Sequence, residues 1–409
     1  MRRYLATTAT IVMTSFACDS ASVDEVGAQA NSFVSSNSPG GSKSTPPAIV
    51  VQSAVDGPLG IDSSEVYVSF IVNIHDWLSR EDNSKTATLN SYTTLTKLIA
   101  MHEAARIPVD FYMTDKMVRD FQQSYPALIE TIKKSSFVAM NYLVRAPNPY
   151  YRNADGSGYF GDLWHTDFKS VRGDDAALYD LIWKYETYGI DMRSGLAISG
   201  KPEGNGGYAY AKSVFGYAPY TVTGASSNDD VNVAAGKVYG DMGATLVVDH
   251  NRVVGWKETS KGGLVVRPET ETVQLFEGVS ASSESVAELG NLLVLAPMAK
   301  MAALRPAGQA AFINYKVHDN DFVANGAPWD CVYYNADTDG DSGCHDNSSA
   351  RSPDYDPANR SFGERDAATR ANLWARYQYA LDYYAANRSS YRMVSARHLA
   401  CYVSLMNCI

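Results

Sequence analysis

A strand that ends in polar residues does most to limit the folds open to this chain. Residues 66–77 read VYVSFIVNIHDW, a run of β-branched and aromatic residues that ends in His75, Asp76 and Trp77. A buried parallel strand that delivers polar side chains to the rim of a sheet has this pattern. The pattern returns in residues 311–322, AFINYKVHDNDF. Because the carboxyl ends of the strands in a parallel β/α barrel meet at one face, we predict that the two His-Asp pairs converge there.

Strand and helix patterns alternate along most of the chain, which predicts βαβ units and a parallel sheet. Pro126 is expected to break the helix predicted at 117–134. The predicted fold is a distorted (β/α)7–8 barrel with loop insertions, one of them at 324–365. The predicted strands are 66–74, 107–113, 136–144, 220–224, 243–249, 311–317 and 391–394, and the predicted helices are 86–105, 117–134, 174–188, 206–216, 231–242, 283–304 and 366–387.

The N-terminus has the features of an export signal. A basic head is followed by a short apolar run, and the sequence Ser-Phe-Ala before Cys18 resembles a bacterial lipobox, in which the cysteine is lipidated. We expect residues 1–18 to be this signal, 19–47 to be a flexible Ser/Gly/Pro-rich linker, and 48–409 to form the folded domain. The protein is expected in the bacterial cell envelope, periplasmic or at the cell surface, with a lipid anchor as its only membrane contact. Plain secretion is the alternative.

Cysteine usage agrees with export. Without Cys18 four cysteines remain, Cys331, Cys344, Cys401 and Cys408. An even number in an exported protein predicts two disulfides, and pairing within each close pair is the simplest of the three connectivities.

Charge and tyrosine content narrow the class of ligand. The formal net charge is −10, which argues against nucleic acid as a partner, because phosphate binding needs a basic surface. The 27 tyrosines are compatible with an apolar face that holds sugar rings, and equally with a large core.

The histidines and acids at the predicted strand ends are the candidate catalytic groups. Asp76, His318 and Asp321 can serve in general acid–base catalysis, or can be a structural pair at a loop start. A zinc-like divalent metal could be held by His75 and Asp76 with His318. His165 could add a ligand from the loop above, although a surface position is the more common explanation.

Other residues are candidates for substrate contacts. Arg145, after the strand predicted at 136–144, could hold a substrate carboxylate or sulfate, or pair with an acid. Trp77 and Tyr142 could hold a sugar ring. Arg267 and Glu269 could line a rim or form a structural ion pair.

A separate pattern predicts a calcium loop. Residues 335–346 read NADTDGDSGCHD, with Gly340 at the sixth position. An acidic turn clamped by a disulfide is the alternative. The candidate ligands are Asn335, Asp337, Asp339, Asp341 and Asp346.

The order of these motifs resembles the polysaccharide deacetylase, or NodB-like, family within the glycoside hydrolase/deacetylase barrels. Residues 66–77 resemble its first motif, a strand that ends in acids. Residues 315–319, YKVHD, resemble its late Leu-x-His motif, and residues 390–399 resemble its closing strand. The resemblance implies that Asp76 is a metal ligand or base and that His318 protonates the leaving group.

The chain departs from the family at the metal positions. Asn73 stands where the first Asp is expected, His75 stands where a Glu is expected, and Asn141 and Arg145 replace the His pair. The leading hypothesis is an exported carbohydrate-active hydrolase that removes an acyl group from a polysaccharide, or cleaves it, with help from a metal. The alternative is an inactive barrel that binds glycan or a cell-envelope partner.

Overall fold

Strand β1 runs over Val66–Ile74 in the computed structural model, with the bounds that its sequence predicts. Every described residue belongs to the unit Ala54–Ile409; the other unit of the chain, Met1–Ser53, lies outside the described residues. The structure describes residues 61–74, 81–143, 151–152, 159–160, 171, 173–188, 204, 206–223, 229–248, 260–276, 282–323 and 365–403.

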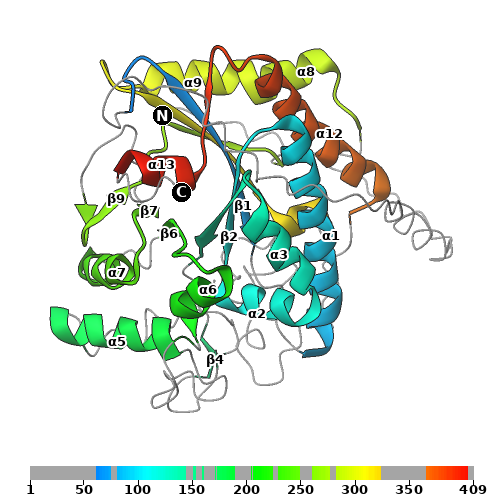
Figure 1. Ribbon diagram of the computed structural model, residues 1–409. Coiled ribbons are helices and arrows are strands. Elements are labelled where there is room, and N and C mark those ends of the chain that lie inside the picture. The colour runs from blue at the N-terminus through cyan, green and yellow to red at the C-terminus, as the bar shows by residue number, and fades with distance from the viewer. Residues whose placement is uncertain are drawn as a thin grey trace, which may run out of the picture. The chain divides into compact units, whose positions relative to one another are not determined.

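Parallel strands form one curled sheet, the barrel-like arrangement that the alternation predicts (Figure 1). The order is β10-β11-β1-β2-β3-β6-β7-β9. Strand β8, Ser260–Lys261, is antiparallel to β9, and β12, Arg392–Met393, adds to β1; β4 (Tyr151–Arg152) and β5 (Tyr159–Phe160) form a separate hairpin. The parallel strands after β1 are β2 Val109–Met113, β3 Val138–Tyr142, β6 Thr221–Thr223, β7 Leu246–Val248, β9 Leu264–Val266, β10 Glu271–Gln274 and β11 Ala311–His318.

Most helices follow the strands and cover the outer face of the sheet, whereas α13 packs against Tyr67 on the other face (Figure 1). The helix predicted at 117–134 does break at Pro126, which begins α3. The helices are α1 Glu81–Ala105, α2 Asp115–Ser124, α3 Pro126–Lys134, α5 Asp175–Tyr188, α6 Gly207–Phe215, α7 Asp229–Met242, α8 Val286–Gly290, the π-helical turn η2 Asn291–Leu295, α9 Ala296–Leu304, the short 3-10 helix η3 Asp319–Phe322, α12 Ala367–Ala386 and α13 Ala396–Val403.

Alternate side chains of each strand point to opposite faces of the sheet. On β1, Phe70 and Val72 belong to the main hydrophobic cluster beneath the helices. Tyr67 and Ile71, at the alternate positions of the strand, belong to two smaller clusters on the other, concave face. Ser69 lies between them on that face, which therefore carries a polar layer between two apolar ones.

The curled sheet does not close into a full barrel. Strands β9 and β10 are the ends of the parallel path, and only Arg267–Thr270 separate them in sequence. Arg267 still bonds to Val247 of β7, whereas the Thr270 N–H already donates to Phe312 of β11. Pro268 lies between them and has no N–H to give to a ladder, so the hydrogen-bonded path is interrupted there.

The strand predicted at 391–394 is found as the shorter β12, but the rest of the segment 390–399, which resembles the family's closing strand, is not strand. Strand β12 pairs with β1 over Arg392–Met393 only, and helix α13 then begins at Ala396. The Ala396 N–H donates to the buried carboxylate of Asp110, 2.7 Å away. This bond satisfies one of the free N–H groups at the start of α13.

The helix predicted at 283–304 is continuous from Val286 to Leu304 but widens into a π turn at η2. Pro297 has no N–H, so it cannot bond to the Leu293 carbonyl four residues earlier. The hydroxyl of Tyr315 on β11 donates to that carbonyl instead. The irregular turn thus fixes the helix to the sheet.

Candidate active site

Asn73 and His318 meet at the carboxyl ends of two neighbouring parallel strands. They are register partners on β1 and β11, and the Asn73 amide nitrogen lies 3.2 Å from His318 Nε2. The two strand ends therefore meet as predicted, while the convergence of the two His-Asp pairs stays a prediction, because His75 and Asp76 lie outside the described residues. In β/α barrels the carboxyl ends of the strands form the face that carries the chemistry.

Asp321 holds the other side of the His318 ring. Its Oδ2 lies 3.2 Å from Nδ1 and accepts from the His318 backbone N–H at 3.0 Å. A carboxylate only accepts, so in this contact Nδ1 carries the hydrogen, and Nε2 accepts from the Asn73 amide. Both side chains remain about one-fifth exposed, 20% and 21%. The arrangement can move a proton to or from a group bound at the rim.

Most of the other predicted site residues lie outside the described residues, so their roles stay predictions. They are Cys18, His75, Asp76, Trp77, Arg145, His165, the calcium-loop candidates Asn335, Asp337, Asp339, Asp341 and Asp346, and the cysteines Cys331, Cys344 and Cys408. Cys401 is described and is disulfide-bonded. Among the described residues no group of three or more His, Cys, Asp or Glu side chains is placed to hold a metal ion.

Tyr142 lies at a different place from the substrate-binding position that we predicted. Its side chain is 2% exposed and belongs to the main core. The ring packs edge-on against Tyr208 of α6, with centroids 5.5 Å apart, and tilted against Tyr239 of α7. Tyr142 therefore joins the sheet to these helices.

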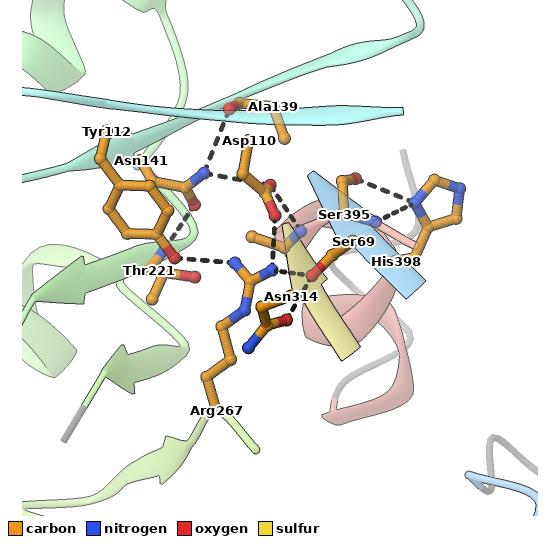
Figure 2. Close-up of polar contacts among 11 residues, drawn as sticks. Ser69, Asp110, Tyr112, Ala139, Asn141, Thr221, Arg267, Asn314, Ser395 and His398 are labelled. Atoms are coloured by element: carbon orange, nitrogen blue, oxygen red, sulfur yellow. Dashed lines mark hydrogen bonds and ion pairs between the residues drawn. The ribbon is translucent and has the colours of Figure 1, made fainter. Parts of the chain in front are cut away.

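A buried ion pair spans the concave face beneath the rim (Figure 2). Arg267 Nη2 lies 2.7 Å from Asp110 Oδ2 and 3.0 Å from Ser69 Oγ. Its Nη1 donates to the Tyr112 hydroxyl at 2.7 Å. Ser69 in turn donates to Asn314. One guanidinium thus connects β1 and β2 with the chain that links β9 to β10.

Asp110 and its neighbours continue this network (Figure 2). Asn141 on β3 donates to Asp110 at 3.2 Å and accepts from the Thr221 N–H of β6 at 3.1 Å. Ser395 and His398 form a second pair of contacts beside it, at the start of α13. The described polar layer is thus held mainly by contacts within the protein.

Burial and charge set the pKa values in this layer. Burial raises the pKa of Tyr112 to about 12, against the pull of Arg267. Burial by itself would lower the pKa of Arg267, but Asp110 and Tyr112 outweigh it and raise the pKa. Arg267 therefore stays charged at neutral pH.

These contacts decide whether the zinc set of the deacetylase family fits here. Asn73 directs its amide nitrogen at His318, and Asn141 directs its own at Asp110. An amide N–H is a donor and cannot ligate a cation. The family set is therefore not assembled at Asn73 and Asn141, and the chemistry proposed below uses the protein's own groups.

Sequence reasoning missed most of the polar layer. Ser69, Asp110 and Asn314 sit inside runs that otherwise read as apolar strands. One signal could have revealed the layer: Asp110 is a charged residue in the middle of an apolar strand, at a position whose side chain faces the interior. Arg267 was left open between a rim position and an ion pair, and it forms the ion pair.

Comparison with known proteins yields only distant structural similarity. No family model matches the sequence, and no curated protein matches it. The similar solved structures include the following three. A 4-α-glucanotransferase from Thermococcus litoralis has a TM-score of 0.35 and 13% identity over 64% of this chain. The match takes in 34% of that enzyme's length.

The other two structures are matched over most of their length. An allantoinase has a TM-score of 0.43 and 10% identity, over 81% of this chain and 89% of its own. A protein described as a polysaccharide deacetylase involved in O-antigen biosynthesis, from Bordetella bronchiseptica, has a TM-score of 0.30 and 12% identity, over 76% of this chain and 90% of its own. These structures are hydrolases or carbohydrate-active enzymes by description, and at these scores the similarity does not decide a function.

Proposed function

We propose that this protein is an exported, lipid-anchored hydrolase that removes an acyl group from a polysaccharide. The observation that carries the proposal is the Asn73–His318–Asp321 arrangement at the carboxyl ends of β1 and β11. It supports acid–base chemistry at the face where β/α barrels work. The acidic chain fits a neutral or basic glycan better than a phosphate polymer.

The reaction needs a base and an acid. Water attacks the acyl carbonyl, and Asp76, two residues beyond the end of β1, is proposed to take a proton from that water. The attack forms a tetrahedral intermediate. His318, protonated on both nitrogens and held by Asp321, then gives its Nε2 proton to the departing sugar oxygen or nitrogen as the bond from that atom to the acyl carbon breaks. Acid–base groups of this kind contribute roughly 10²–10⁴-fold to rate.

The test is release of acetate from an acetylated glycan by the full-length protein. An N-acetylated chitooligosaccharide and an O-acetylated xylan serve as probes. His318→Gln and Asp76→Asn are each expected to lower kcat by roughly 10²-fold or more. Asp382→Asn, an exposed change on α12, is the matched control and should leave kcat unchanged. Full turnover in both site variants would exclude the proposed mechanism.

A second candidate is a barrel that binds glycan without turning it over. The bonding of Asn141 within the polar layer favours it, because the position that resembles a family metal ligand is taken up in internal contacts. This candidate predicts that neither probe releases acetate in the same assay. Calorimetry with the same probes should still measure binding.

A further inference from the structure

One helix carries most of the large apolar side chains that are exposed among the described residues. Six such residues are exposed, and four lie on the helix Val286–Leu304. Leu295 is 64% exposed, and Val286 73%. Leu292 and Leu304 are both 43% exposed. Scattered single apolar residues need no explanation, but a group on one element marks an interaction surface.

The helix is neither a core helix nor a membrane span. By length and composition alone it could cross a bilayer, although the sequence predicts no segment that does. Only 28% of its most apolar window is buried, which is low for a core helix. Its inner face packs into the main core through Leu289, Leu293 and Met301. Tyr315 also fixes it to the sheet. The helix therefore lies along the folded unit with one face outward (Figure 1).

The outward face is poor in charge. Of its twelve exposed residues, nine are apolar, Asn291 is polar, and only Glu288 and Lys300 are charged. Solvent-facing helix surfaces are normally dominated by charged and polar residues. Glu288 is occupied in capping the helix start with Ser285, and Lys300 lies 3.7 Å from Glu271. The central stripe, Leu292, Leu295, Ala299 and Ala303, recurs at spacings of three and four, so it shares one side of the helix.

The chain's N-terminal side reaches the domain beside this helix. Arg305, the first residue after α9, donates to the Ser63 carbonyl at 2.6 Å. Ser63 lies just before β1, at the start of the described chain. The predicted linker of residues 19–47 leads from Cys18 toward this point, and a random coil of that length spans roughly 30 Å. An anchor at Cys18 would therefore keep a lipid surface close to this helix.

We propose that the exposed face of Val286–Leu304 rests on the lipid bilayer to which the chain is anchored. The helix would lie in the plane of the interface with its apolar stripe among the acyl chains. Two weak attachments in one chain reinforce each other, because the anchor raises the local concentration of the bilayer around the helix. With one acid and one base on its exposed face, the helix needs no anionic lipid.

The test uses the full chain with Cys18→Ser, so that no acyl chain contributes, and neutral phosphatidylcholine vesicles. Co-flotation measures the fraction bound. The double variant Leu292→Gln, Leu295→Gln is expected to lower vesicle binding by roughly tenfold or more, since each buried leucine contributes substantially to partition. Val233→Gln on α7, 42% exposed in the unsubstituted chain, is the matched control and should bind like the parent.

Three outcomes would overturn the proposal. The first is a parent that does not bind vesicles, and the second is a double variant that binds as well as the parent. The third is a dimer in gel filtration that the double variant converts to a monomer, which would show that a second copy of the chain covers the helix. Circular dichroism and the melting temperature of the double variant confirm that it is folded. The proposal rests on the lipid anchor of the proposed function but not on His318, so acetate release tests the proposed chemistry separately.

Discussion

Arg267 and Asp110 form an ion pair at 2.7 Å with side chains that are 2% and 0% exposed. The pair joins β2 to the linker between β9 and β10, where the ladder of the sheet is interrupted. Because the sheet does not close by backbone bonds there, the pair ties the interrupted edge to β2, in the middle of the sheet, across the concave face. The candidate site stands on this layer.

The pair gives the first prediction. Arg267→Met should cost about 3–5 kcal/mol of unfolding free energy, because it leaves the Asp110 charge buried without its partner. Urea unfolding followed by circular dichroism measures the cost. Lys184→Met breaks the exposed Asp180–Lys184 pair on α5 and should cost less than about 1 kcal/mol. Equal costs for the two changes would show that the buried pair has no special role.

The raised pKa of Glu186 predicts that the folded protein loses stability as pH rises. Burial raises the pKa of this carboxyl from 4.5 to about 7, although Tyr239 and the Tyr208 N–H both donate to it. Between these values the folded protein holds more protons than the unfolded chain, so the contribution is present below pH 4.5 and is lost as pH rises through 7. The difference is roughly 3 kcal/mol.

Glu186→Gln removes this titration. Between pH 5 and 8, measured in one buffer series, the melting temperature of the wild type should fall relative to that of the variant. This is about the pH range that lies between the unfolded and folded pKa values of Glu186. Gln keeps an acceptor for the Tyr208 N–H. Parallel curves for the two proteins would contradict the raised pKa.

The lowered pKa of His102 predicts the opposite effect at lower pH, a loss of stability as pH falls. Burial lowers its pKa from 6.5 to about 3. Nδ1 lies 3.0 Å from the Ile107 carbonyl, so it carries the hydrogen, and Nε2 accepts from the Tyr377 hydroxyl at 2.7 Å. The unfolded chain binds the proton first, so stability is present above pH 6.5 and is lost as pH falls toward 3.

His102→Gln should flatten this acid limb. The unfolding free energy of the wild type is expected to drop by roughly 2–3 kcal/mol more than that of the variant between pH 6.5 and 4.5. His398, whose pKa burial lowers to about 4, is present in both proteins, so its contribution cancels in the difference. A variant as sensitive to acid as the wild type would count against a neutral buried His102.

Gly207, at the start of α6, has a φ of +51°, and a Cβ there would lie 2.5 Å from the Glu186 Cα. Gly207→Ala should therefore cost about 1–2 kcal/mol for the left-handed backbone and a further 1–3 kcal/mol for the overlap. Gly216→Ala is the control, with a φ of +77° and open space, and should cost only the first amount. Thermal unfolding of both variants separates backbone strain from steric overlap. Equal losses of unfolding free energy in the two variants would argue against the overlap at Gly207.

The sequence predicted elements better than contacts. Strand β1 was predicted with its exact bounds, because a long β-branched run has no helical alternative. Strands β9 and β10 were missed, because each is short and Pro268 between them reads as a loop. Helix α13 was not predicted, because its start depends on Asp110, far away in the sequence. Local patterns do not record such partners.

The candidate site shows the same division. The pairing of the β1 and β11 ends followed from the rule that parallel strands share a carboxyl edge, and His318 with Asp321 was placed correctly at that edge. Tyr142 was misplaced by one step of the strand alternation, which sends it to the helices and its neighbour Asn141 to the interior. A one-residue change of face cannot be read from a strand that is apolar on both sides.

The pairing of β1 with β11 also has a consequence for biosynthesis. Ser69 and Asn314 hydrogen-bond across a separation of 245 residues. A ribosome that adds about 5–20 residues per second needs roughly 10–50 seconds to make the second strand after the first. During that time one edge of a nine-residue, largely apolar strand has no partner. Such an edge is an aggregation hazard, so the nascent chain should depend on a holdase until β11 emerges.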